Sequence, residues 1–133
     1  MTKIVVDTNV IVSANISSSG NPAEIMNQVY LGVVTVYYSK GILAEYKRVL
    51  SYEKFDFPVD IQKGIIEAIE EVGILIEPPV STITLPDETD RGFYDTAKAS
   101  GAILITGNIK HYPAEPFIMS PTDFMKAHFS SPI

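Results

Sequence analysis

Carboxylate side chains occur at three widely separated places where they could act on one ligand. Asp7 directly follows an apolar, β-branched run at residues 4–6. Glu45 interrupts the apolar stripe of a segment with helical periodicity, and Asp90 lies in an acidic stretch. Carboxylates gathered in one cleft repel one another unless a cation lies among them. Because neither histidine nor cysteine belongs to this set, its oxygen donors favour Mg²⁺ or Mn²⁺ over Zn²⁺.

Divalent cations held by carboxylates bind substrate phosphates, activate water and stabilise the leaving oxygen of a phosphodiester. The three acids therefore predict metal-assisted nuclease chemistry, and no nearby side chain is an obvious general base. Each acid also has a purely structural interpretation. Asp7 could cap the turn after its strand, and acids at a helix start complement the helix dipole. Their joint occurrence at one edge of the predicted fold favours a site.

Strands and helices alternate along the chain, which predicts an α/β fold with right-handed crossovers. We expect a central, mostly parallel sheet of about five strands with helices on both faces. Apolar, β-branched and aromatic runs predict strands at residues 3–7, 33–38, 74–77, 103–105 and 117–119. In such a sheet, the segments after the first, second and fourth strands open on one edge. These segments contain Asp7, Glu45 and Asn108.

Apolar periodicity and capping residues predict where the helices begin and end. A short helix or turn is expected at residues 9–14, and longer helices at 22–31, 40–50, 61–72, from the acidic start 85–90 to 100, and from 121 to the carboxyl terminus. The expected N-cap residues are Asn21, Ser39, Asp60 and Ser120. Glu45 follows Ile42 by three residues and precedes Val49 by four, which places it on the inward face of its helix.

Length and composition limit the class of protein. The 133 residues most economically form one domain, residues 1–133, and the composition of 46% hydrophobic and 20% charged residues is that of a globular protein. The absence of cysteine excludes disulfides, thiolate metal sites and thiol nucleophiles. The amino terminus has only three apolar residues between Lys3 and Asp7, too few for a signal-peptide core, and no apolar stretch has the length of a membrane span. We therefore expect a cytoplasmic protein without a membrane partner.

The net charge of −6 is unusual for a protein that acts on nucleic acid, and the ten cationic residues form no run. Taken alone, this charge argues against tight non-specific binding through phosphate neutralisation. Bound cations change the inference, because clustered carboxylates count as excess negative charge only until cations occupy them.

Four motifs, in this order, resemble those of the PIN domain family. They are Asp-Thr-Asn-Val at 7–10 after an apolar strand, Ala-Glu-Tyr at 44–46, Asp-x-x-Asp-x-x-Phe at 87–93, and Ile-Thr-Gly-Asn at 105–108. The resemblance extends over residues 3–120. More specifically, the chain is similar to the PIN-family toxin components of prokaryotic toxin–antitoxin pairs.

The resemblance implies a PIN-like three-layer domain and a Mg²⁺- or Mn²⁺-dependent endoribonuclease that hydrolyses single-stranded RNA. It makes Asp7, Glu45 and Asp90 the catalytic metal ligands. It further implies a cognate antitoxin and a homodimer or larger homo-oligomer as partners. The residues that would brace the site by hydrogen bonds are Thr8, Asn9 and Thr106.

Asn108 stands where the family often has a fourth acid. Its amide oxygen is still a metal ligand but carries no charge, so we expect a second metal to bind more weakly. Asp87 and Asp95, three residues before and five after Asp90, are the weaker candidate ligands that would supply the missing charge. Weak candidates for contacts with substrate phosphate are Lys110 and His111.

Other functions fit the chain less well. A phosphotransfer protein with Asp7 as nucleophile would need a second Asp two residues later, where the chain has Asn9. The glycine-rich patterns that bind nucleotide phosphates follow none of the predicted strands. A catalytically weak or inert PIN-fold module that binds RNA or protein stays open as an alternative, because Asn108 removes one acid.

Overall fold

A computed structural model describes residues 2–129, and a sheet of five short strands lies at its centre. The strand order is β3-β2-β1-β4-β5, and every pairing is parallel. The strands are β1 (Lys3–Val6), β2 (Thr35–Tyr38), β3 (Ile74–Leu75), β4 (Ile103–Ile105) and β5 (Ile118–Met119). All five predicted strands are therefore confirmed, although most are shorter than their apolar runs.

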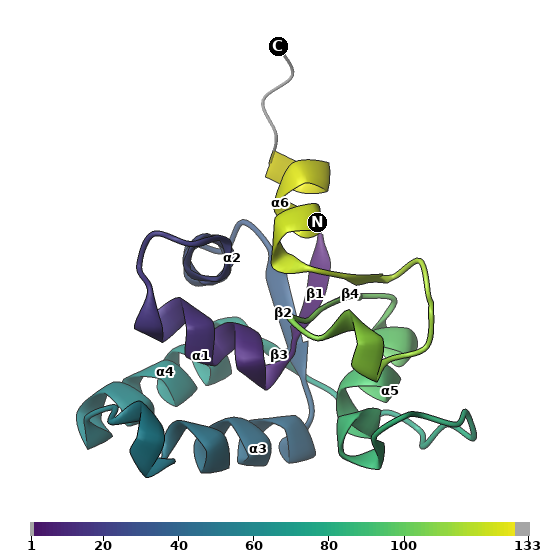
Figure 1. The fold of residues 1–133 in the computed structure, drawn as a ribbon, viewed down its shortest axis with the longest axis horizontal. Coiled ribbons are helices and arrows are strands. Elements are labelled where there is room, and N and C mark those ends of the chain that lie inside the picture. Colours follow the sequence, from purple (N-terminus) through teal and green to yellow (C-terminus); the bar gives the residue numbers. More distant parts are fainter. Residues whose placement is uncertain (1, 130–133) are drawn as a thin grey trace.

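Helices lie on both sides of this sheet, which confirms the predicted α/β architecture. Figure 1 shows α1, α2 and α4 on one side and α5 on the other, while α3 passes beneath the carboxyl ends of the strands. The helices are α1 (Thr8–Ile16), α2 (Asn21–Tyr30), α3 (Lys40–Leu50), α4 (Val59–Val72), α5 (Arg91–Ser100) and α6 (Pro121–Phe129). In the part of the chain that the structure describes, no helix has the length and apolar character needed to cross a membrane.

The central strand β1 is apolar on both of its faces because helices cover both sides of the sheet. Ile4, Val5 and Val6 have no exposed surface. The backbone amide of Asp7 donates to the carbonyl oxygen of Ile105 at 2.9 Å, so the pairing of β1 with β4 extends one residue beyond the strand. The backbone of Asp7 is thus fixed by the sheet itself.

Two predicted helix caps are confirmed. The Ser39 hydroxyl oxygen accepts from the amide of Ile42 at 3.1 Å and begins α3, the helix that carries Glu45. The Ser120 hydroxyl oxygen accepts from the amide of Asp123 at 3.0 Å and begins α6. The expected continuation of α6 to the carboxyl terminus lies outside the described residues.

The predicted caps Asn21 and Asp60 are wrong. Helix α2 already includes Asn21, and Gly20 is its N-cap, because the Asn21 side chain donates to the hydroxyl of Thr122 at 3.1 Å instead of capping. Helix α4 begins at Val59, one residue before the expected cap, with Pro58 as its N-cap.

The acidic stretch before α5 is not part of that helix, which corrects a third predicted helix start. The Asp87 carboxylate accepts from the amide of Thr89 at 3.0 Å and from its hydroxyl at 2.8 Å. Such a local turn competes with helix formation. A 3₁₀ turn at Glu88–Asp90 results, and α5 starts at Arg91 with Asp90 as its N-cap.

The end of α4 packs so tightly on β2 that only glycine fits. A Cβ atom at Gly73 would lie 2.7 Å from the carbonyl oxygen of Ile69 and 2.9 Å from the ring of Tyr38. We expect Gly73→Ala to lower the free energy of unfolding by about 1–3 kcal/mol. Gly64→Ala is the control, because nothing lies within 4 Å of a Cβ there. Gly64→Ala should raise the free energy of unfolding by about 1 kcal/mol, because alanine favours a helix more than glycine does. Urea denaturation measures both, and a stable Gly73→Ala variant would contradict the packing.

Candidate active site

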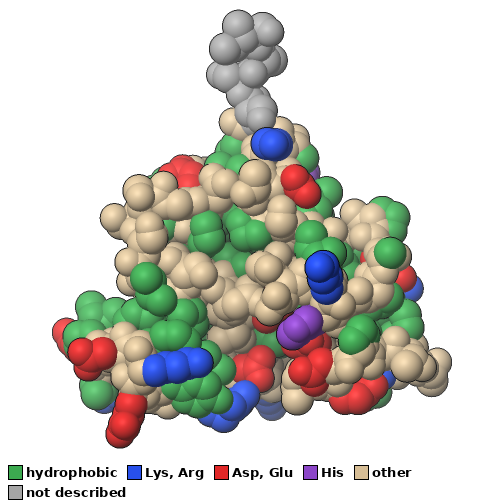
Figure 2. Space-filling view, viewed as in Figure 1, with side chains coloured by type: hydrophobic (Ala, Val, Ile, Leu, Met, Phe, Trp, Pro, Cys, Tyr) green, Lys and Arg blue, Asp and Glu red, His purple; other side chains and the backbone are tan. Residues whose placement is uncertain are grey.

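The carboxyl ends of β1 and β4 meet at one edge of the sheet, beside the starts of α1 and α5 and above α3 (Figure 1). Val6 pairs with Ile105, so the residues that follow these two strands are neighbours. In the same view, Figure 2 shows Asp and Glu side chains gathered around a histidine in this region. The predicted edge therefore carries the predicted kinds of side chain.

Asp7 is a buried carboxylate that two hydroxyl groups hold. Its side-chain oxygen Oδ2 accepts from the hydroxyl of Thr106 at 2.8 Å and from that of Tyr112 at 3.0 Å. Burial raises the pKa of Asp7, and these two hydrogen bonds oppose the rise. Because both donors bind the same oxygen, they fix the orientation of the carboxylate at the end of β1.

Tyr112 is a site residue that the sequence reasoning missed. It follows the 3₁₀ turn Ile109–His111 after β4 and is buried. Burial and the carboxylates of Asp7 and Asp90 raise the pKa of its phenol, so the hydroxyl stays protonated and remains a donor. The signal in the sequence was an aromatic residue at the end of a polar turn, which alone does not identify its partner.

Glu45 reaches the same edge from α3. The neighbouring Tyr46 has no exposed surface, and its hydroxyl donates to the carbonyl oxygen of Val6, which ties α3 to β1. One carboxylate oxygen of Glu45 accepts from the hydroxyl of Thr8 at 3.3 Å. The other pairs with Arg48 at 2.8 Å. The predicted inward carboxylate thus lies against the start of α1.

The predicted bracing residues link the start of α1 to the loop after β4. The Asn9 side-chain oxygen accepts from the amide of Gly107 at 2.9 Å. Thr106 donates to Asp7, and its hydroxyl oxygen also accepts from the amide of Asn108 at 3.0 Å. Together with the contact from Thr8 to Glu45, these hydrogen bonds join three elements at the carboxyl edge.

The tightest group of potential metal ligands is Asp87, Asp90 and His111. Among the residues that the structure describes, these three acidic or imidazole side chains have ligand atoms that all lie within 4.8 Å of one another. The Nδ1 atom of His111 is 3.7 Å from Oδ2 of Asp90. Asp7 and Glu45 lie outside this close group, although their charges act on Asp90.

The Asp90 carboxylate is in an environment that disfavours its charge. Burial, followed by the negative charges of Asp7 and Asp87, raises the pKa of Asp90 to about 6. Its Oδ2 atom is buried and has no hydrogen-bond partner. Buried polar atoms are nearly always satisfied by a protein group, water or an ion. The orphaned oxygen and the surrounding carboxylates therefore fit a divalent cation.

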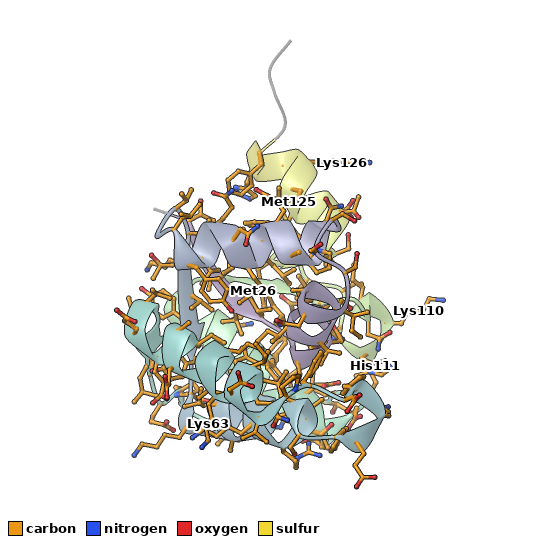
Figure 3. The ribbon with its side chains drawn as sticks, turned by 90° about the vertical axis from the view of Figure 1, so that its left-hand side faces the viewer. Met26, Lys63, Lys110, His111, Met125 and Lys126 are labelled. Carbon is orange, nitrogen blue, oxygen red and sulfur yellow. The ribbon has the colours of Figure 1, made fainter. Side chains whose placement is uncertain are left out.

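Three other predicted residues do not join this group. Asp95 is buried, and one of its oxygens accepts from the backbone amide of Ser81 at 3.1 Å, in the connector before α5. Asn108 is exposed and contacts the site through its backbone amide. Figure 3 shows the side chain of Lys110 extending away from the molecule. Of the two acids expected to supply the missing charge, Asp87 alone lies beside Asp90.

Comparison with known proteins places this geometry in context. A family model described as "PIN domain" matches residues 3–110, a range that contains Asp7, Glu45, Asp90 and Asn108. A protein of Methanocaldococcus jannaschii, described only as uncharacterized, is 31% identical over 109 residues. The aligned region covers 80% of this chain and 70% of that protein.

Proposed function

Because the chain belongs to the PIN domain family, we propose that it is a metal-dependent endoribonuclease that hydrolyses single-stranded RNA. The observation that carries the proposal is the buried, unpartnered oxygen of Asp90. It lies in the electrostatic field of three further acids, Asp7, Asp87 and Glu45. A nuclease-type fold with a carboxylate cluster at its carboxyl edge is the arrangement in which divalent cations assist phosphodiester hydrolysis.

Asp7, Glu45 and Asp90 are the residues that would hold Mg²⁺ or Mn²⁺. When bound, the cation supplies an activated water and stabilises the leaving oxygen. The neutral donors Thr106 and Tyr112 hold Asp7. Glu45 is held by the hydroxyl of Thr8 and by the guanidinium of Arg48. Such partners are fixed before substrate arrives, which removes part of the cost of orienting the ligands.

The negative net charge makes RNA binding depend on the cation. With a net charge of −6, the chain cannot attract phosphates by its overall field. Cations at the carboxylate edge reverse the local sign. We therefore expect RNA binding to require divalent metal, unlike binding by a basic protein.

The proposal is tested with purified protein and a fluorescent single-stranded RNA in Mg²⁺, Mn²⁺ or EDTA. Matched duplex RNA and single-stranded DNA serve as substrate controls, and Asp7→Asn and Asp90→Asn serve as enzyme controls. We expect cleavage of the single-stranded RNA in either metal, and none in EDTA or in the two variants. Cleavage that survives all three controls would come from a contaminant.

One observation favours a second candidate function. Asn108 is uncharged at the place of the fourth acid, so the fold could serve as an inert RNA- or protein-binding module. Binding of the single-stranded RNA without cleavage in any metal would support this module and contradict the nuclease.

The cellular role that we propose is that of a toxin in the cytoplasm, held inactive by a cognate antitoxin. It is supported by the similarity of the four motifs to PIN-family toxins. Growth arrest on expression, relieved by co-expression of the neighbouring gene product, is the expected result. Co-purification of the two proteins tests the pair directly, and light scattering of the purified chain tests the proposed homo-oligomer.

Tyr112→Phe is expected to weaken Mn²⁺ binding about tenfold, because groups that orient metal ligands typically contribute that much to affinity. The change removes one of the two donors to Asp7 and keeps the buried ring. Tyr94→Phe is the matched control, since Tyr94 is also buried but donates to Glu115 at 3.2 Å. Titration calorimetry measures both variants. An equal loss of affinity in both would show a general packing effect.

A further inference from the structure

Three side chains with metal-binding atoms converge from two turns that are remote in the sequence. Asp87 is the N-cap of the 3₁₀ turn before α5, Asp90 is the last residue of that turn, and His111 ends the 3₁₀ turn after β4. Their ligand atoms lie within 4.8 Å of one another. Atoms that share one cation at about 2.1 Å are about 3–4 Å apart. Small side-chain rotations therefore suffice to bring all three onto one ion.

The central member of this cluster has an unsatisfied oxygen. Oδ2 of Asp90 is buried and accepts no hydrogen bond. The His111 nitrogen, at 3.7 Å, is too far away to donate one. An unpaired buried carboxylate oxygen costs free energy that a protein normally recovers through a partner. Its ligand atom is grouped with those of another carboxylate, Asp87, and an imidazole, His111, and a divalent cation is a partner that would satisfy all three.

The imidazole decides which cation fits best. Mg²⁺ prefers oxygen ligands and retains its waters, whereas Mn²⁺ and the later transition metals accept nitrogen. We propose that His111 donates a nitrogen ligand to a divalent cation held by Asp87 and Asp90, and that this set binds Mn²⁺ in preference to Mg²⁺. The role of this cation in cleavage rests on the proposed function. The preference for Mn²⁺ over Mg²⁺ concerns metal binding alone.

This assignment changes the role expected for two residues. The sequence predicts His111 as a weak candidate for contacts with substrate phosphate, and the structure brings its Nδ1 atom to 3.7 Å from Oδ2 of Asp90. Asn108 lacks the charge of the fourth acid, and Asp87, whose ligand atom is grouped with that of Asp90, would supply it. The side chain of His111 is 51% exposed, so its ring is free to turn onto an ion.

Pulsed electron paramagnetic resonance of bound Mn²⁺ tests the nitrogen ligand directly, with tag-free protein and Mn²⁺ alone. The chain has two histidines. His128, the second, is exposed in α6 and stacks on Phe124 at a centroid distance of 4.6 Å. We expect nitrogen modulation in the wild type and in the control His128→Ala, and its loss in His111→Ala.

Calorimetric titrations complete the test of metal preference. His111→Ala should lower the affinity for Mn²⁺ about tenfold and leave that for Mg²⁺ unchanged. Absence of nitrogen modulation in the wild type, its persistence in His111→Ala, or equal losses for both metals would overturn the inference. Nitrogen-bound Mn²⁺ without RNA cleavage would refute the proposed function alone. Cleavage by a protein whose Mn²⁺ shows no nitrogen ligand would refute this inference alone.

Discussion

Asp7→Asn is expected to reduce RNA cleavage at least about 100-fold while leaving the temperature of unfolding unchanged or higher. Asparagine keeps the shape of the side chain but removes the charge of a proposed metal ligand. The hydroxyls of Thr106 and Tyr112 can each donate or accept, so both can still bond the amide. Cleavage rate and thermal unfolding are measured on the same preparation without metal carried over.

The opposite effects on activity and stability follow from the burial of Asp7. Burial raises the pKa of Asp7, which means that its charged form is less favourable in the fold than in water. A neutral side chain removes this cost near neutral pH. Asp60→Asn, which removes an exposed acid in the first turn of α4, is the control. It should leave cleavage unchanged and lower the temperature of unfolding only slightly, through the lost interaction with the helix dipole. If Asp7→Asn lost stability together with activity, Asp7 would be a structural residue.

The position of the candidate site on the sheet was predictable because it follows from local sequence and sheet topology. A continuous apolar run that ends in Asp7 indicates a buried parallel strand, and parallel strands end on a common edge. The helix of Glu45 was predictable for a similar reason, since its cap and its apolar stripe lie within the same segment. These signals need no knowledge of contacts between remote residues.

The partners of the carboxylates were not predictable from local sequence. Tyr112 reaches Asp7 across 105 positions of the chain, and the predicted cap Asn21 instead donates to Thr122, 101 positions away. Each of these contacts depends on how the elements pack. Sequence periodicity describes one element at a time, so it misses a side chain whose partner belongs to another element.

The local backbone conformation decides which of two acids, Asp87 or Asp95, lies beside Asp90. A 3₁₀ turn has about three residues per turn, so Asp87 lies on the same side as Asp90. An α-helix rotates about 100° per residue, and five residues place Asp95 on a different face. The spacing alone did not separate the two candidates, because it did not show that the segment 88–90 forms a 3₁₀ turn.

Acidification is expected to move cleavage and metal-free stability in opposite directions. The pKa of Asp90 is about 6 in the fold and 3.8 as a free side chain. Between these values the folded state binds more protons than the unfolded state, so the metal-free protein gains stability as the pH falls. The difference between the two pKa values of Asp90 corresponds to a gain of at most about 3 kcal/mol in the free energy of unfolding. This gain is absent above the folded pKa. Urea denaturation across this range measures the gain.

We expect cleavage to follow the ionised form of Asp90, because a protonated carboxyl group would not hold the proposed cation. We expect the rate to fall about tenfold for each pH unit below the pKa of Asp90. Saturating metal favours the charged carboxylate and should shift the midpoint of the fall to lower pH. Asp90→Asn should be inactive, and its unfolding free energy should rise less on acidification than that of the wild type. Asp7 adds to the remaining rise, since burial raises its pKa also. Parallel losses of activity and metal-free stability on acidification would mean that acid unfolds the protein instead of titrating the site.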